Sequence, residues 1–239
     1  MSFALLMPAA GGGVRLGAEL PKALVEIAGA PMFLHAARPF LRNAQCVEAV
    51  VAAPAGWEPR FQQAADREWG KERVRVVTGG AVRQESVACA LAALISDAEF
   101  VLIHDAARPL VGEALIGRVL AALADAVAAV PALPLADTLK RTDEQKTVVE
   151  TVERAGLVAV QTPQGILRAA AEEAQRRARA EGFKGTDDVS LIEHFALGAV
   201  KAVAGNPSNF KITTTEDLTL ARKLMELNGQ CAGASGKNR

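Results

Sequence analysis

The sequence has little of several features that would place it in a specialised class. Its 239 residues include only three cysteines, and its 27 basic residues are balanced by 27 acidic ones. Cys46, Cys89 and Cys231 are far apart and fit neither a disulfide framework nor a metal knuckle, so we interpret them as free thiols in a reducing cytoplasm. The balanced charge gives no sign of a nucleic-acid or membrane partner, and any anion binding is expected to be local.

Long apolar runs are also missing. No run approaches the roughly 20 residues that span a bilayer, and Met1-Ser2-Phe3 lacks the positive charge that precedes the apolar part of a secretory signal. We therefore expect a cytoplasmic protein without a membrane-spanning segment. Apolar residues make up 50% of the chain, which is enough for the core of one large α/β domain.

Short apolar runs alternate with helical patterns along the first half of the chain. This alternation predicts a mostly parallel, twisted sheet with helices on both faces. The predicted strands are 3–9, 47–53, 73–79, 100–106 and 126–133, and the predicted helices between them are 32–42, 59–69, 83–95 and 113–124.

Residues 136–163 interrupt this alternation. They are polar, rich in threonine and β-branched residues, and broken by turns, which predicts a protruding β-hairpin arm. After the arm we expect helices at 165–180 and 187–196, strands at 199–205 and 209–213, and a last helix at 215–227. Asp187 and Asp188 are interpreted as caps of the second of these helices. We place a single domain at 1–227 and a flexible tail at 228–239.

The stretch "PAAGGGVRLGAELPKAL" follows the first predicted strand. Its glycines miss the dinucleotide spacing by one residue, Pro21 interrupts the helix that should receive a pyrophosphate, and Lys22 lacks the Ser or Thr of a Walker loop. The two cations Arg15 and Lys22 suit nucleotidyl transfer, in which a substrate phosphate attacks the α-phosphorus of a nucleotide. Taken alone, the loop is equally consistent with two solvated surface cations.

The stretch "VLIHDAARP" places His104 and Asp105 at the carboxyl end of a strand, where open α/β sheets bind ligands. Asp105 is a candidate for binding Mg²⁺ through water. Arg108 either binds the incoming phosphate or pairs with Asp105. We interpret His104 as a buried, hydrogen-bonded residue, because an attacking phosphate is already anionic near neutral pH.

A third stretch, "TGGAVRQES" at 78–86, runs from a strand through two glycines into a helix. Free N–H groups at the start of that helix could bind an anion or a base edge, although an ordinary strand-to-helix turn is the alternative.

These stretches, in order with "ADTLKR", "VERAGL", "QTPQ", "TDDVS" and "NFKIT", resemble the 2-C-methyl-D-erythritol 4-phosphate cytidylyltransferase family through about residue 226. The resemblance implies a Rossmann-like nucleotidyltransferase fold, similar to that of type A glycosyltransferases. It also implies an enzyme of isoprenoid biosynthesis that joins CTP and 2-C-methyl-D-erythritol 4-phosphate to give 4-diphosphocytidyl-2-C-methyl-D-erythritol and pyrophosphate. A polyol-phosphate cytidylyltransferase using ribitol 5-phosphate, or a CTP-binding regulator without activity, remains the alternative.

The resemblance also implies roles for individual residues. Arg15 and Lys22 would stabilise the transition state, with Mg²⁺ or another divalent cation present. Nucleotide binding would rest on Ala9, Ala10, Gly11, Gly12, Gly13, Gly79, Gly80, Ala81 and Ser86, and substrate binding on Asp105, Ala106, Arg108, Thr138, Arg154 and Lys211. Thr138 and Arg154 would act in the partner's site of a homodimer formed through the 136–163 arm.

Overall fold

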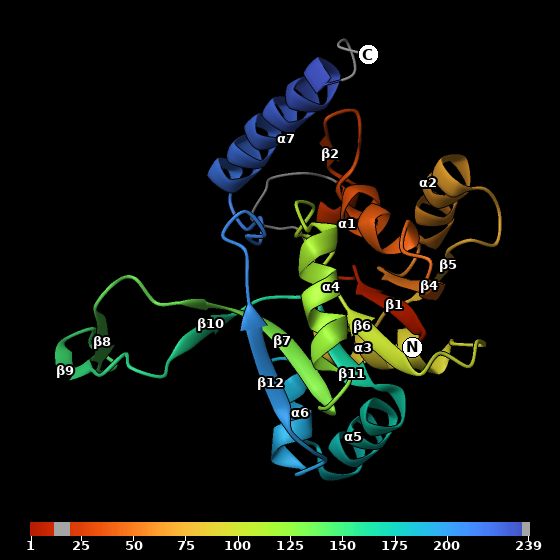
Figure 1. Ribbon diagram of the computed structural model, residues 1–239. Coiled ribbons are helices and arrows are strands. Elements are labelled where there is room, and N and C mark those ends of the chain that lie inside the picture. The colour runs from red at the N-terminus through yellow and green to blue at the C-terminus, as the bar shows by residue number, and fades with distance from the viewer. Residues whose placement is uncertain (12–19, 236–239) are drawn as a thin grey trace.

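The computed structural model describes residues 1–11 and 20–235, and within these ranges an eight-stranded sheet forms the centre of the molecule (Figure 1). The strand order is β10-β7-β11-β6-β1-β4-β5, with β12 beside β7. Parallel pairing joins β1 (Phe3–Pro8), β4 (Cys46–Ala53), β5 (Arg75–Thr78) and β6 (Phe100–Ile103), and also β7 (Ala128–Pro134) with β12 (Val200–Ala204). The antiparallel strands are β10 (Val158–Val160) and β11 (Gln164–Leu167).

Helices cover both faces of this sheet because successive strand residues point to opposite sides. On one face Phe3 and Leu5 pack with α1 (Met32–Leu41), α2 (Glu58–Trp69) and α4 (Glu113–Ala122). On the other face Ala4 and Leu6 pack with the remaining covering helices, which are α3 (Arg83–Ala92), α5 (Arg168–Glu181) and α6 (Val189–His194). The predicted α/β fold with a mostly parallel sheet is confirmed.

The strand order creates a crevice beside β1. The chain passes from β1 outward to β4 and β5, and then crosses to β6 on the other side of β1. Loops that leave neighbouring strands at such a reversal separate from one another, and ligands of open α/β sheets bind there. The predicted phosphate loop and the "HDAARP" stretch follow the two strands, β1 and β6, that flank this point.

Small elements after the first loop pack against the C-terminal helix. After Pro21 the chain forms a short 3₁₀ turn η2 (Lys22–Leu24) and a small hairpin of β2 (Glu26–Ile27) and β3 (Ala30–Pro31). The last helix, α7 (Thr215–Ser235), packs on this hairpin through a third core cluster that includes Ile27, Ile212 and Leu218. The segment before α7 is thereby held next to η2.

The predicted arm is a hairpin of β8 (Leu139–Thr142) and β9 (Val148–Val152). It forms a two-stranded sheet of its own and extends far from the body of the protein (Figure 1). Val148 and Val149 are 57% and 58% exposed. The protruding hairpin is therefore confirmed, and β10 returns the chain to the central sheet.

Three expectations about the second half differ from the structure. Residues 164–167 form strand β11, whereas a helix was expected from residue 165, because pairing with β6 on one side and β7 on the other makes this stretch part of the central sheet. Residues 209–213 form no strand, since the Ile212 N–H donates to Ala107 O (2.9 Å) in a loop contact. The last helix ends at Ser235 and not at 227. The flexibility of a tail at 228–239 and the single domain at 1–227 stay predictions, and residues 236–239 lie outside the described ranges.

Two predictions drawn from what the sequence lacks can be compared with the described residues. None of their helices has both the length and the apolar character needed to cross a membrane. Cys46 is buried and Cys89 is half-buried, and neither forms a disulfide. Burial raises the pKa of the Cys46 thiol to about 11, which is typical of an inert core cysteine.

Candidate active site

The loops after β1, β5 and β6 meet in a cavity of about 210 Å³ at the carboxyl edge of the sheet. The lining joins small residues with three cations and one carboxylate: Pro8, Ala9, Ala10, Gly11, Lys22, Ala23, Arg83, Ser86, Asp105, Ala106, Ala107 and Lys211. Eight of these are residues that the family resemblance singled out, from segments as far apart in the sequence as Ala9 and Lys211, and the fold brings them together. Their roles in binding or catalysis stay predictions.

Two of the predicted nucleotide-binding loops pack directly against each other. Backbone hydrogen bonds attach both loops to the end of β4. The Ala9 N–H donates to Ala52 O (2.8 Å), and the Gly79 N–H donates to Ala53 O (2.7 Å). A Cβ atom at Gly79 would lie 2.6 Å from the Cβ of Ala10. Glycine is therefore required at position 79 by the close approach of the loops.

The turn into α3 is fixed by its own side chains. The Glu85 carboxylate accepts the Ala81 N–H (2.8 Å), and the Ser86 hydroxyl accepts the Gly80 N–H (3.2 Å). These two N–H groups precede α3 and are satisfied locally by the cap, so they are not free for a ligand. Ligand binding by the N–H groups of the first turn of α3 stays a prediction. What the loop offers to a ligand is a rigid shape beside Ala10.

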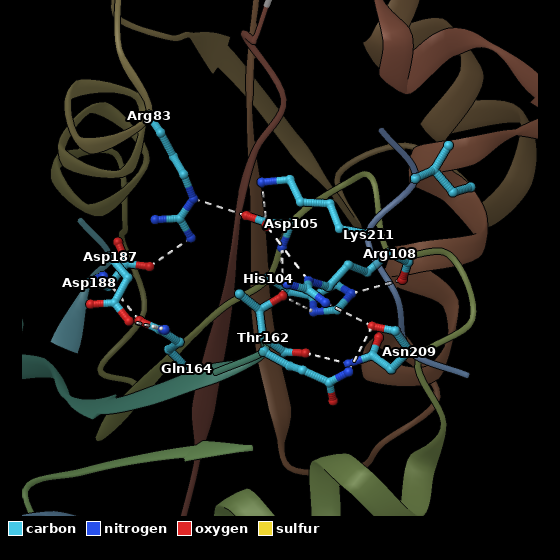
Figure 2. A network of polar contacts seen from close by, with 12 residues as sticks. Arg83, His104, Asp105, Arg108, Thr162, Gln164, Asp187, Asp188, Asn209 and Lys211 are labelled. Carbon is cyan, nitrogen blue, oxygen red and sulfur yellow. Dashed lines mark hydrogen bonds and ion pairs between the residues drawn. The ribbon is translucent and has the colours of Figure 1, made fainter. Parts of the chain in front are cut away.

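Asp105 is the most strongly paired carboxylate of the site (Figure 2). Its Oδ1 accepts from Arg83 Nε (2.9 Å), and its Oδ2 lies 3.0 Å from Lys211 Nζ and 3.7 Å from Arg108 Nε. Burial acts to raise the pKa of Asp105, but Arg83 and Lys211 together hold it well below its usual range. The carboxylate is therefore ionised and fixed in orientation.

Arg108 resolves one of the alternatives left open by the sequence. Its side chain is only 13% exposed, it does not line the cavity, and its NH1 group donates to Asn209 O (2.8 Å). The sequence left two alternatives for Arg108, phosphate binding and pairing with Asp105, and the structure contains the pairing. Substrate binding by Arg108 itself stays a prediction.

His104 lies under the cavity floor and not in it. It is fully buried against Phe40, its Nε2 is 3.1 Å from Arg108 O, and its Nδ1 is 3.0 Å from the Thr162 hydroxyl. Burial lowers the pKa of His104 to about 4, so the ring is neutral at physiological pH. The interpretation of His104 as a buried, hydrogen-bonded residue is confirmed.

Lys22 comes to the cavity from the 3₁₀ turn η2, and its Nζ donates to Ile212 O in the loop before α7. Pro21 precedes it with φ −51°, within the narrow range of a proline ring. The other predicted catalytic residue, Arg15, and the predicted binding residues Gly12 and Gly13 lie outside the described residues.

Thr138 and Arg154 are not brought to this cavity. Both are exposed and belong to the arm, where Arg154 NH1 donates to Leu135 O (3.3 Å) and Ala136 O. Within one chain, the arm and the cavity are thus separate regions.

Sequence reasoning missed Arg83, which lines the cavity and bridges two carboxylates. A cation in the first turn of a helix is unfavourable next to the positive end of the helix dipole, so Arg83 at the start of a predicted helix was a usable signal for a nearby anion. One of those anions is Asp188, whose Oδ2 accepts from Arg83 NH2 at 2.7 Å. Its interpretation as a helix cap is therefore wrong, because its side chain is engaged by Arg83. That of Asp187 is confirmed, since its Oδ1 accepts the Ser190 N–H (2.9 Å).

A glycine-lined loop, cations and one ionised carboxylate at the switch point of a mostly parallel sheet define an α/β nucleotidyltransferase. The chain matches the 2-C-methyl-D-erythritol 4-phosphate cytidylyltransferase family over residues 3–227 and belongs to that family.

Individual relatives agree with this assignment. The enzyme of that name from Nocardia farcinica is 45% identical over 227 residues, covering 94% of each chain. That from Bacillus mycoides is 40% identical over 225 residues, covering 94% of this chain and 98% of the relative. The crystal structure of the enzyme from Thermus thermophilus has a TM-score of 0.79 at 35% identity, covering 95% of this chain and all of that one.

Proposed function

We propose that this protein transfers the cytidylyl group of CTP to 2-C-methyl-D-erythritol 4-phosphate. A phosphate oxygen of the polyol phosphate attacks the α-phosphorus of CTP, the bond from that phosphorus to the bridging oxygen breaks, and pyrophosphate leaves. The products are 4-diphosphocytidyl-2-C-methyl-D-erythritol and pyrophosphate. The main support is the convergence of Lys22, Lys211 and Arg83 on one cavity, in a chain that belongs to this cytidylyltransferase family.

The proposed reaction depends more on stabilisation of negative charge than on proton transfer. The attacking phosphate is already anionic, and the transition state spreads negative charge over the oxygens of the α-phosphorus. In our proposal Lys22 and Arg15 stabilise that negative charge, and Lys211 binds the phosphate of the polyol. The neutral, buried His104 is left out of the chemistry, because it has no access to the cavity.

We assign cytosine recognition to the rigid loop that contains Gly79, Gly80, Ala81 and Ser86. We assign binding of the triphosphate to the loop after β1, which contains Ala9, Ala10 and the glycines from Gly11 to Gly13. Small residues let a nucleotide approach the backbone closely, and the fixed turn at α3 keeps the pocket shape constant. A preformed shape lowers the entropic cost of ordering a loop around the base.

Mg²⁺ fits the residues present as an ion that arrives with the nucleotide. Asp105 contributes one ionised carboxylate to the cavity, and Mg²⁺ in nucleotide sites is usually held by one or two carboxylates together with phosphate oxygens and water. When bound, the ion would neutralise charge on the phosphates. Asp105 is the residue proposed to hold it.

We further propose that the arm joins two copies of the chain in a cytoplasmic homodimer. The hairpin exposes Val148 and Val149 and extends away from the body of the protein. Thr138 and Arg154 flank its two strands and do not line the cavity of their own chain. An exposed, extended hairpin with apolar side chains is a common element of strand exchange between subunits. In such a dimer Thr138 and Arg154 would contact the polyol phosphate in the partner's site.

The reaction is tested by measuring pyrophosphate release from CTP with each polyol phosphate in turn. We expect turnover with 2-C-methyl-D-erythritol 4-phosphate and Mg²⁺, and at least about tenfold lower kcat/KM with ribitol 5-phosphate, because specificity rests on contacts to the alcohol. Faster turnover with ribitol 5-phosphate would overturn the substrate. CTP binding without turnover on either phosphate would overturn the reaction.

A further inference from the structure

Asp188 is a buried carboxylate at the start of α6 that does not line the cavity (Figure 2). Its backbone N–H and that of Val189 donate to Gln164 Oε1, at 3.0 and 3.1 Å, while Gln164 Nε2 donates to Asp187 (2.8 Å). Gln164 belongs to β11 in the central sheet and is only 2% exposed. The position of Asp188 is therefore set by the sheet, independently of any ligand.

The carboxylate of Asp188 has one cationic partner among the described residues, which is Arg83 at 2.7 Å. The same guanidinium donates from Nε to Asp105 Oδ1 at 2.9 Å, so Arg83 bridges a carboxylate outside the cavity and a carboxylate inside it. A guanidinium is planar, and two donors engaged in different directions leave it little rotational freedom. Asp188 thus fixes Arg83, and Arg83 fixes one oxygen of Asp105.

The other oxygen of Asp105 is held by a more exposed partner. Lys211, at 3.0 Å from Oδ2, has a side chain that is 42% exposed, compared with 31% for Arg83 and 3% for Asp188. A flexible lysine that also has to serve a substrate phosphate is a weak orienting group. Arg108 is less exposed, but its Nε lies 3.7 Å from Oδ2, beyond hydrogen-bond distance. The shortest guanidinium contact of the Asp105 carboxylate is therefore the one to Arg83, which Asp188 holds.

The turn into α3 does not need Arg83 for its shape. Glu85 and Ser86 satisfy the N–H groups of Ala81 and Gly80. Loss of the bridge is thus expected to leave the proposed cytosine-recognition loop intact and to act on Asp105 alone.

We infer that Asp188 is a positioning residue for the reaction, which acts through Arg83 to hold the Asp105 carboxylate in its working orientation. This inference rests on the proposed function, in which Asp105 holds the Mg²⁺ that would neutralise charge on the phosphates. Asp188 itself does not line the cavity. Through Asp188 and Gln164, α6 and β11 would nevertheless help to orient the Asp105 carboxylate.

The test is a double-mutant cycle of Asp188→Asn and Arg83→Gln, with Asp187→Asn as the matched control. Asp188→Asn leaves Arg83 paired with Asp105, so no buried charge loses every partner. We expect kcat to fall roughly tenfold, because a small misplacement of a reacting group has effects of this size. The Kd of CTP, measured by calorimetry, should change less than about twofold, and Asp187→Asn should change kcat less than about twofold.

The cycle distinguishes action through Arg83 from a separate structural role. In the Arg83→Gln background, Asp188→Asn should cause no further loss of kcat, since the contact that transmits its effect is already gone. Multiplicative losses in the double variant, an equal loss in Asp187→Asn, or an equal loss of CTP affinity would each overturn the inference.

Two further measurements separate this inference from folding and from the proposed function. If Asp188→Asn does not fold, Arg83→Gln by itself replaces it, because a neutral amide forms no ion pair with either carboxylate. Unchanged kcat in that variant would also overturn the inference. A crystal structure of the variant tests the position of Asp105 without reference to activity. A rotated carboxylate supports the inference, whereas an unmoved one contradicts it. Absence of pyrophosphate release by the unaltered protein would instead count against the proposed function.

Discussion

The cluster around Asp105 and the 136–163 arm, with its β8–β9 hairpin, both contain predicted substrate-binding residues, but they are built in opposite ways. In the cluster, Asp105 is 6% exposed and receives cations from three separate segments, which are α3, the loop after β6 and the segment before α7. In the hairpin, Arg141 and Glu150 pair at 2.8 Å while 64% and 53% exposed. Sequence neighbours hold the hairpin, whereas distant segments hold the cluster.

This difference teaches which part of the site is complete in one chain. Buried ion pairs are strongly sensitive to the loss of a partner, and exposed ones contribute little. The floor of the cavity is therefore organised before any substrate arrives. Among the residues that the structure describes, the hairpin has no comparable support, which is what we expect of an element that is completed by a partner.

The largest expected effect concerns the chemistry in the cavity. Lys22→Ala should lower kcat by roughly 10²-fold or more while changing the Kd of CTP much less, because a charge that acts on the transition state contributes little to ground-state binding. Steady-state pyrophosphate release and calorimetric CTP titration give the two numbers. Lys71→Ala, an exposed lysine near the opposite end of β5, is the control. Equal losses in rate and affinity would make Lys22 a simple phosphate anchor.

The second prediction applies one substitution to both regions. Thr162→Val should lower the free energy of unfolding by about 2 kcal/mol, because it leaves His104 Nδ1 and the Asp105 N–H without their buried hydroxyl partner. Thr151→Val removes an exposed hydroxyl that accepts from Lys140 Nζ. This variant should change the free energy of unfolding by less than about 0.5 kcal/mol. Urea denaturation measures both. Similar values for the two variants would remove the contrast between cluster and hairpin.

The smallest expected effect concerns the arm. Arg154→Ala should raise the KM for the polyol phosphate by about tenfold with little change for CTP, since one exposed charge–phosphate contact is lost. Arg141→Ala, whose ion-pair partner Glu150 lies on the same hairpin, should change it less than about twofold.

Mixing variants tests whether Arg154 acts across subunits. A heterodimer of Lys22→Ala and Arg154→Ala chains has one site with both residues intact if Arg154 serves the partner, and none if it serves its own chain. Recovery of activity on mixing is expected. No recovery, in a preparation shown to contain mixed dimers by sedimentation and mass spectrometry, would place Arg154 in its own subunit's site.

Much of the fold could be predicted because local patterns are strong in the first half of the chain. The runs at 3–9 and 100–106 became β1 and β6, and the polar stretch at 136–163 became the hairpin with a returning strand. The strand at 164–167 was missed, since the four residues Gln-Gly-Ile-Leu directly before a helix are too few to show a period of their own. Its assignment depends on the gap between β6 and β7 that it fills.

The site followed the same division. The phosphate loop, "TGGAVRQES" and "HDAARP" were recognisable as motifs in a fixed order. Eight predicted site residues, seven from these three motifs and Lys211 from "NFKIT", line one cavity. Arg83 was passed over and Asp188 was interpreted as a cap, because 105 positions separate them and nothing local in the sequence relates one to the other.

The sequence by itself determined the α/β class, the exposed arm and the cytidylyltransferase family, because periodicity, turn residues and ordered motifs are local properties of the chain. Only the tertiary structure decided which charges meet. Asp105 gains Arg83 and Lys211, Arg83 gains Asp188, and His104 loses access to the cavity, since contacts between distant segments depend on strand order and burial. Electrostatic energies fall with distance and rise with burial, and neither quantity can be read along a sequence.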